Sequence, residues 1–148
     1  MKHFIFFFTF LFVFSACQQN DMVDPTLEQP TKINYSTKNA PFNQKVAKKA
    51  EEIAESYDGV PKAISVNTDR KLLLAFQLDH MKRFQLKQKE KTIEKKLKKS
   101  FRDYDVTVSS DMKIYWETEK LINKLENLDK REMNKKVENI IQLSREET

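Results

Sequence analysis

Residues 64–78 read Ile-Ser-Val-Asn-Thr-Asp-Arg-Lys-Leu-Leu-Leu-Ala-Phe-Gln-Leu, and this stretch decides the fold. Ile64 and Val66 alternate with polar residues, which predicts a half-buried strand. After a short turn at 68–70, apolar residues occupy both faces of the segment 72–78, so we expect a second strand that is covered on both sides. Two strands joined by so short a turn predict a hairpin.

Helical patterns flank this hairpin. Before it, apolar residues at 46–57 recur on one helical face, with Asn43 as the expected N-cap and Asp58-Gly59 as the stop. After it, residues 81–102 carry a narrow apolar stripe among charged residues, which predicts an amphipathic helix.

A short third strand and two more helices complete the predicted order. Residues 106–109 alternate between valine and hydroxyl residues, as in a short strand. Ser110 or Asp111 can then cap a helix that we expect to run to Leu128, and residues 133–141 place apolar side chains on one face of a final helix. The predicted fold class is α+β, a helix-strand-strand-helix-strand sandwich with two C-terminal helices appended as a hairpin.

The chain begins with the features of an export signal. A charged start is followed by the apolar run 4–14 and by Ser15-Ala16-Cys17, which ends in the only cysteine. The thirteen residues from Phe4 to Ala16 would form a helix of roughly 20 Å, too short for a hydrocarbon core of about 30 Å. Small residues before a lone cysteine are typical of a bacterial lipobox, although Phe14 replaces the usual Leu, Val or Ile. We therefore predict a diacylglyceryl anchor, with fatty acids such as palmitate, on Cys17.

Two other outcomes fit the same residues. Ordinary secretory cleavage after Ser15 would leave a free thiol near the start of the mature chain, and an uncleaved segment would remain as an apolar tail. Lipidation explains best why the single cysteine lies at this position, because Cys17 has no disulfide partner and no metal-ligand neighbours in the sequence.

Composition limits the rest of the chain to one compact domain. Without a signal peptide at 1–16, the chain keeps 26 basic and 22 acidic residues, a net charge of +4. Residues 17–42 carry three of the four prolines among polar residues, which predicts a lipidated N-terminus and a flexible linker. The α+β domain is assigned to 43–148. A single glycine, Gly59, leaves no glycine-rich phosphate loop.

These features resemble the sporulation lipoproteins of the YhcN/YlaJ family, and the YlaJ-like branch most closely. The likeness lies in residues 14–17, in the helix end and strand at 57–67, and in the run Val106-Thr107-Val108-Ser109-Ser110-Asp111 before a long helix. The resemblance implies a Gram-positive, endospore-forming source, a lipid anchor in the cell or spore membrane with the domain outside the cytoplasm, and a part in spore germination or outgrowth. It brings no catalytic residues, so we expect a non-enzymatic structural or interaction module, for example one that binds a spore membrane protein.

The strongest anomaly of the domain is a basic helix. Residues 82–102 hold ten basic and two acidic residues, a local net charge of +8. Five of the cations share one helical face, and we call them the basic strip: Lys87, Lys91, Lys95, Lys98 and Arg102. Such a strip can dock on anionic lipid or a cell-wall polymer, but a charged helix face is also commonly plain solvated surface.

No pattern in the sequence predicts catalysis, a metal, a cofactor or nucleic-acid binding. His80 lies beside Asp79, but nothing indicates that Ser109 or Ser110 approaches it as a nucleophile. The cysteine, histidine and acidic residues are not spaced along the chain as the ligands of a metal site are. The aromatic residues of the basic helix fit its ends and its apolar stripe better than a platform for stacking bases.

Two smaller groups receive structural interpretations. Glu51, Glu52 and Glu55 are expected to form surface pairs with lysines on the polar face of the first helix. Of the neighbours Tyr115 and Trp116, we expect the tyrosine to pack in the core and leave open whether the tryptophan is exposed as a contact for a partner.

Overall fold

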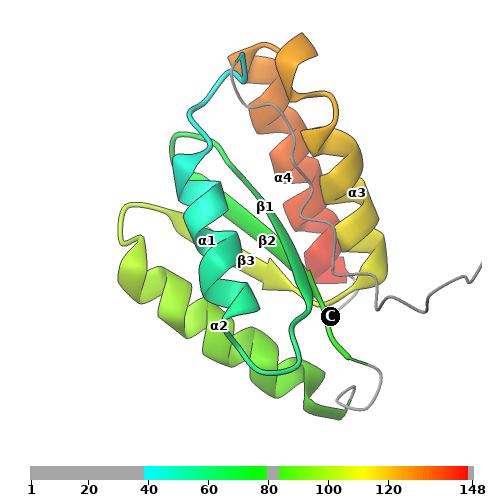
Figure 1. The fold of residues 1–148 in the computed structure, drawn as a ribbon. Helices are drawn as coiled ribbons and strands as arrows, with labels where there is room; N and C mark the ends of the chain where they lie inside the picture. The colour runs from blue at the N-terminus through cyan, green and yellow to red at the C-terminus, as the bar shows by residue number, and fades with distance from the viewer. Residues whose placement is uncertain (1–38, 80–83, 147–148) are drawn as a thin grey trace, which may run out of the picture.

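A three-stranded sheet lies between two pairs of helices in the computed structural model, which describes residues 39–79 and 84–146 (Figure 1). The elements in chain order are α1 (Lys45–Glu55), β1 (Lys62–Asn67), β2 (Lys71–Gln77), α2 (Leu86–Ser100), β3 (Asp105–Ser109), α3 (Met112–Ile122), the short 3-10 helix η2 (Leu125–Asn127) and α4 (Lys130–Glu146). This order confirms the predicted α+β class and the predicted sequence of helices and strands.

The predicted hairpin forms the centre of the sheet. β1 pairs antiparallel with β2, so that Ile64 lies opposite Ala75 and Asn67 opposite Leu72. β2 is the middle strand, and its other side pairs in parallel with β3. Parallel neighbours require a crossover connection, and α2 supplies it.

One face of the sheet packs against α1 and α2. Its core joins small side chains of α1, such as Ala50, to Ile93 and Leu97 of α2 and to Leu74 and Phe76 of β2, all of them fully buried. The prediction that β1 is half buried is wrong, because Ser65 on this face is also buried. The Ser65 hydroxyl donates to the carbonyl oxygen of Leu73 at 2.8 Å, which satisfies the only polar group that this side chain brings into the core.

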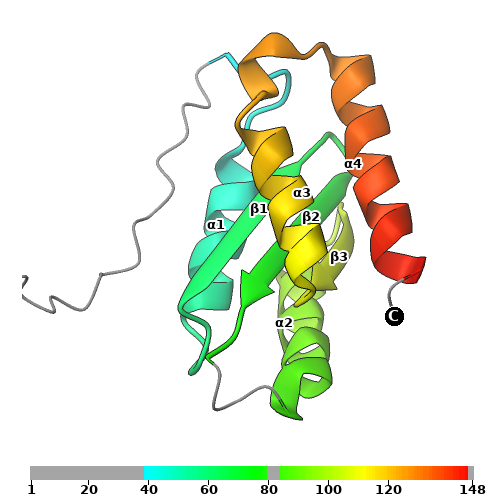
Figure 2. The same cartoon turned by 90° about the vertical axis from the view of Figure 1, so that its right-hand side faces the viewer.

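The other face packs against α3 and α4. Ile64 and Leu73 from the sheet join Ile114 of α3 and Val137 and Ile141 of α4 in a second cluster of buried residues. The two C-terminal helices are therefore a full layer of the fold rather than an appended hairpin, as Figure 2 shows from the side. α3 also ends at Ile122, before the predicted end at Leu128, and η2 follows it.

Sequence-encoded signals set several element ends. Gly59 has a φ of 81°, a conformation that glycine adopts without strain, and it follows the end of α1 as predicted. Asp111 caps α3 by accepting hydrogen bonds from the N–H groups of Lys113 and Ile114. At the start of α4, Asp129 and Glu132 bond to each other's backbone N–H groups and form a capping box.

The described chain enters the domain beside the start of α4. Phe42 packs against the cluster under α3 and α4, and the ammonium of Lys130 lies 5.7 Å from the centre of its ring. The segment that precedes the domain is therefore attached at the N-terminal end of α4, about 25 Å along this helix from its C-terminal end.

Candidate functional site

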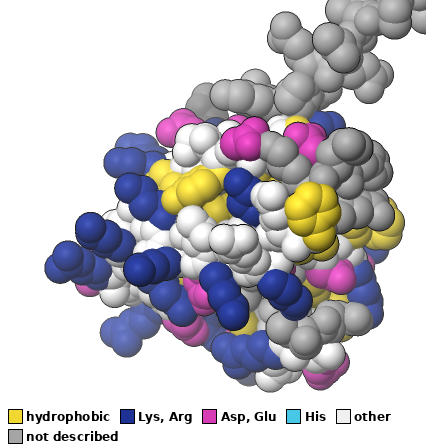
Figure 3. All heavy atoms as spheres, turned by 90° about the horizontal axis from the view of Figure 1, so that it is seen from below, with side chains coloured by type: hydrophobic (Ala, Val, Ile, Leu, Met, Phe, Trp, Pro, Cys, Tyr) yellow, Lys and Arg dark blue, Asp and Glu magenta, His cyan; other side chains and the backbone are white. Residues whose placement is uncertain are grey.

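The basic strip lies on the outer surface of α2. Ile93 and Leu97 turn inward to the sheet, while all five residues of the strip are exposed. Four of them belong to α2 itself, and Arg102 follows the end of the helix at Ser100. Figure 3 shows Lys and Arg side chains spread over the face of the molecule seen from below, where α2 is the lowest element of Figure 1.

Ion pairs reduce the number of free cations in the strip. The ammonium of Lys98 lies 2.7 Å from Glu94, and that of Lys87 lies 3.9 Å from Glu90, both within α2. Among the residues that the structure describes, the other three members of the strip form no ion pair: Lys91, Lys95 and Arg102. α2 as a whole carries seven lysines and two glutamates, a net charge of +5, so the exposed face stays strongly positive.

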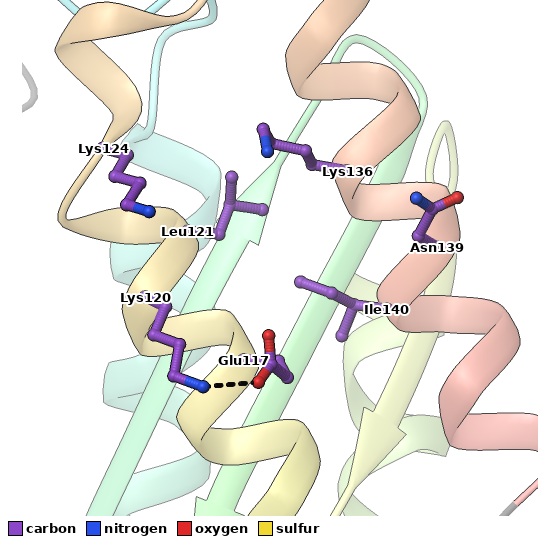
Figure 4. A pocket seen from close by; sticks show the side chains of 7 residues that line it. All are labelled: Glu117, Lys120, Leu121, Lys124, Lys136, Asn139 and Ile140. Carbon is purple, nitrogen blue, oxygen red and sulfur yellow. Dashed lines mark hydrogen bonds and ion pairs between the residues drawn. The ribbon is translucent and has the colours of Figure 1, made fainter.

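A second basic site lies in a groove between α3 and α4. The groove has a volume of about 240 Å³, and its floor is formed by the buried side chains of Leu121 and Ile140. Figure 4 shows cationic side chains on both rims, from the α3 side and from the α4 side, and the groove is lined by three lysines: Lys120, Lys124 and Lys136. The ammonium of Lys120 is already paired, at 2.6 Å from Glu117.

No motif in the sequence indicates this groove. The signal available was the pair Lys120 and Lys124, four residues apart, but Lys136 joins them only because α4 packs beside α3. The groove thus offers a short polar rim over an apolar floor, whereas the strip on α2 offers a longer row of exposed charges.

Tyr115 and Trp116 take opposite positions on α3. Tyr115 is buried, as predicted, and burial together with the negative charges of Glu119, Glu51 and Glu55 raises its pKa to about 12. The phenol therefore stays protonated at neutral pH. Trp116 is 54% exposed, which makes it one of the few large apolar side chains on the described surface.

The remaining sequence candidates are structural or lie outside the described residues. Glu90 accepts hydrogen bonds from the Ser110 N–H and hydroxyl at 2.6 and 2.7 Å, which ties α2 to the loop after β3. The Ser109 hydroxyl accepts a bond from the N–H of Asp111. Cys17 and His80 lie outside the described residues. Within 39–79 and 84–146, no group of three or more His, Cys, Asp or Glu side chains could hold a metal ion.

Comparison with known proteins places the chain in a family. The sequence model of the family described as Sporulation lipoprotein YhcN/YlaJ matches residues 18–143. No curated protein and no solved structure matches the chain. None of the helices in the described part of the chain has the length and apolar character needed to cross a membrane.

Proposed function

Because the chain belongs to the sporulation lipoprotein YhcN/YlaJ family, we propose that it is a non-enzymatic structural or interaction module of the spore envelope, held at a membrane through a lipid on Cys17. The match over residues 18–143 is the observation that carries this proposal. It covers the predicted linker as well as the folded domain. The chain is thus a sporulation lipoprotein, and the lipid anchor sets its location.

The arrangement of the parts supports an interaction role. In this proposal the linker predicted from the sequence, about 25 residues long, acts as a coil that spans roughly 25 to 30 Å and holds the domain clear of the lipid headgroups. We place the domain outside the cytoplasm, where its surfaces can recruit a partner in the spore envelope. In this proposal the module supports germination or outgrowth of the spore.

Deletion and complementation in the spore-forming host test this role. We expect spores without the protein to release dipicolinic acid or resume growth more slowly than native spores, and the native chain to restore both rates. A chain with His80→Ala should restore them equally well, because the proposed role needs no catalytic imidazole. Deletion without effect on either rate would contradict the role, and a folded His80→Ala chain that fails to restore them would contradict a non-enzymatic module.

The exposed face of α2 favours a second candidate function. The basic strip presents Lys91 and Lys95 on a helix of net charge +5 and Arg102 just after the helix end, and none of these three cations has an ion-pair partner among the described residues. In this second proposal the strip docks on anionic lipid or a cell-wall polymer and acts as an additional membrane signal. Each cation near an anionic surface contributes about 1 kcal/mol to such binding.

Sedimentation with vesicles tests the docking of the strip. The unlipidated chain 18–148 should bind phosphatidylglycerol vesicles at low salt and lose binding at about 1 M salt, where the Debye length falls to about 3 Å. Replacing Lys91, Lys95 and Arg102 with glutamine should weaken binding on the order of 100-fold.

The groove between α3 and α4 supplies the matched control. Replacing Lys120, Lys124 and Lys136 with glutamine also removes three positive charges, but from another face of the molecule. This variant should keep most of the binding. Equal losses in the two variants would show that binding follows net charge alone, and no binding at low salt would contradict the second function.

A further inference from the structure

The outer edge of β1 is closed by side chains. The N–H groups of alternate residues in a strand point away from the neighbouring strand. In β1 these are the N–H groups of Ala63, Ser65 and Asn67, which donate to Glu55 at 3.3 Å, Glu51 at 2.7 Å and Gln44 at 3.0 Å, respectively. Gln44 also donates to the carbonyl of Asn67 at 2.8 Å, so both backbone groups of Asn67 are bonded at this edge. This gives Glu51 and Glu55 a role beyond surface pairing, because they prevent another strand from adding to β1.

The outer edge of β3 is open by comparison. The N–H of Asp105 donates to the carbonyl of Arg70 at 2.7 Å, which directs the amide groups of Asp105 toward β2. Because direction alternates along a strand, Thr107 and Ser109 also face β2, whereas the N–H and C=O groups of Val106 and Val108 point to the free edge. In the described residues, no side chain is bonded to these outward groups as Glu51 and Glu55 are to those of β1.

A groove runs along this open edge. It has a volume of about 360 Å³ and is lined by all five residues of β3, with α2 on one side and the C-terminal end of α4 on the other. Five residues of strand are about 16 Å long, which is the length of one short extended segment. The two helix layers thus leave a slot that extends along the whole of β3.

The charges around the groove are mostly positive and favour an acidic occupant. Lys87, Lys91 and Lys98 of the basic strip line it from α2, and Arg145 lines it from α4. Two of the three carboxylates in the lining, those of Glu90 and Glu94, already bond to Ser110 and Lys98. Lys91 and Arg145 have no ion-pair partner in the described part of the chain.

From these observations we infer that β3 accepts an extended, acidic segment of a partner protein as an added strand. The backbone groups of Val106 and Val108 bond to the segment, and the surrounding cations pair with its Asp or Glu side chains. This inference deepens the interaction module proposed above and rests on it, since it names the chemistry of the partner. It also gives three members of the basic strip a protein ligand rather than a lipid.

Two other occupants fit the groove less well. A second copy paired antiparallel through β3 would bring two α2 helices, each of net charge +5, to the same face of the joined sheet, and like charges repel. The preceding segment of this chain has acidic residues at 21–28, but Pro25 interrupts that stretch and Pro30 follows it, and proline cannot donate a ladder hydrogen bond.

A peptide pair tests the inference on the full chain in detergent. The probes are the acetylated heptapeptide Glu-Val-Glu-Thr-Glu-Val-Glu and its counterpart with lysine in place of glutamate. We expect the acidic peptide to slow solvent exchange of the Val106 and Val108 amides at least about tenfold by NMR, and the basic peptide to leave exchange unchanged. The inference would be overturned if the acidic peptide slowed exchange only at amides on another surface, or if both peptides slowed exchange of the Val106 and Val108 amides equally.

Val108→Pro provides the specific variant, because it removes an outward N–H at an edge position where proline is tolerated. We expect the Kd of the acidic peptide to rise about tenfold, while Val108→Thr, which keeps the amide, binds as the native chain does. An unfolded Val108→Pro chain is identified by its NMR spectrum, and Lys91→Glu with Arg145→Glu then serves instead, with the same expected loss.

The remaining outcomes are also decisive. If the chain is a dimer and its Val106 and Val108 amides are protected from solvent exchange without peptide, a second copy occupies the groove and the inference is overturned. Protection in a monomer that disappears on deletion of residues 18–38 would overturn it in favour of the chain's own linker. Absence of peptide binding, with spore germination still restored by the native chain, would overturn this inference and leave the proposed function in place.

Discussion

Replacing Cys17 with serine is expected to reduce lipid labelling of the chain to background. In cells fed a clickable palmitate, the native chain should carry the label and remain in the membrane fraction after washing with high salt. Each buried methylene contributes about 0.8 kcal/mol, so two or three acyl chains hold the protein effectively permanently, whereas a serine at position 17 cannot form the thioether. The Cys17→Ser chain should therefore carry no label, and it should lose its lipid-dependent retention once the signal is removed.

A displaced thiol provides the control for this result. Cys17→Ser combined with Ser36→Cys keeps one cysteine in the mature chain but places it outside the lipobox, and we expect it to remain unlabelled. Label on this double variant would indicate a less specific acylation of thiols. A native chain without label would favour ordinary secretory cleavage, and it would contradict the anchor on which the proposed function depends.

The central part of the fold was predictable because its signals are local. Alternation at Ile64 and Val66, the two apolar faces of β2, and the helical stripe ending at Leu97 each follow from residues close in sequence. Asp111 also acts as the cap that its position indicates, because it bonds to N–H groups two and three residues away. These features need no knowledge of the rest of the molecule.

The features that the sequence did not indicate depend on contacts between distant residues. Glu51 closes the edge of β1 at Ser65, fourteen residues away, and Gln44 reaches Asn67 across twenty-three. No periodic pattern in the sequence predicts hydrogen bonds between residues so far apart in the chain. The same holds for the second layer of helices and for Lys136 in the α3–α4 groove, since the approach of α4 to α3 places them there.

The basic strip illustrates the division between the two kinds of feature. Its five residues are all exposed, and four of them recur along α2 at the predicted spacing, whereas Arg102 lies after the end of the helix. The sequence could not indicate that Lys87, Lys91 and Lys98 also line a groove beside β3, because the crossover of α2 brings them to that strand. The lysines of α2 lie beside a strand edge only because the chain crosses over from β2 to β3 through this helix.

Replacing Phe76 with alanine is expected to lower the free energy of unfolding by about 3 to 5 kcal/mol. Phe76 is 0% exposed and packs on β2 in the cluster shared with α1 and α2, so its removal leaves a cavity that rigid neighbours fill only in part. Because small domains are stable by only about 5 to 15 kcal/mol, this loss would take a large share of the total. Urea unfolding of the two chains, followed by circular dichroism, measures the difference.

Phe84→Ala is the matched control, because it removes the same atoms from a side chain that is 84% exposed. The change at Phe84 should stay within about 0.5 kcal/mol, since no packed neighbours are lost at the surface. Similar effects at the two positions would contradict the burial of Phe76 between the sheet and α2. A large difference would instead show that Phe76 is tightly packed between the sheet and the layer of α1 and α2, the layer that carries the basic strip.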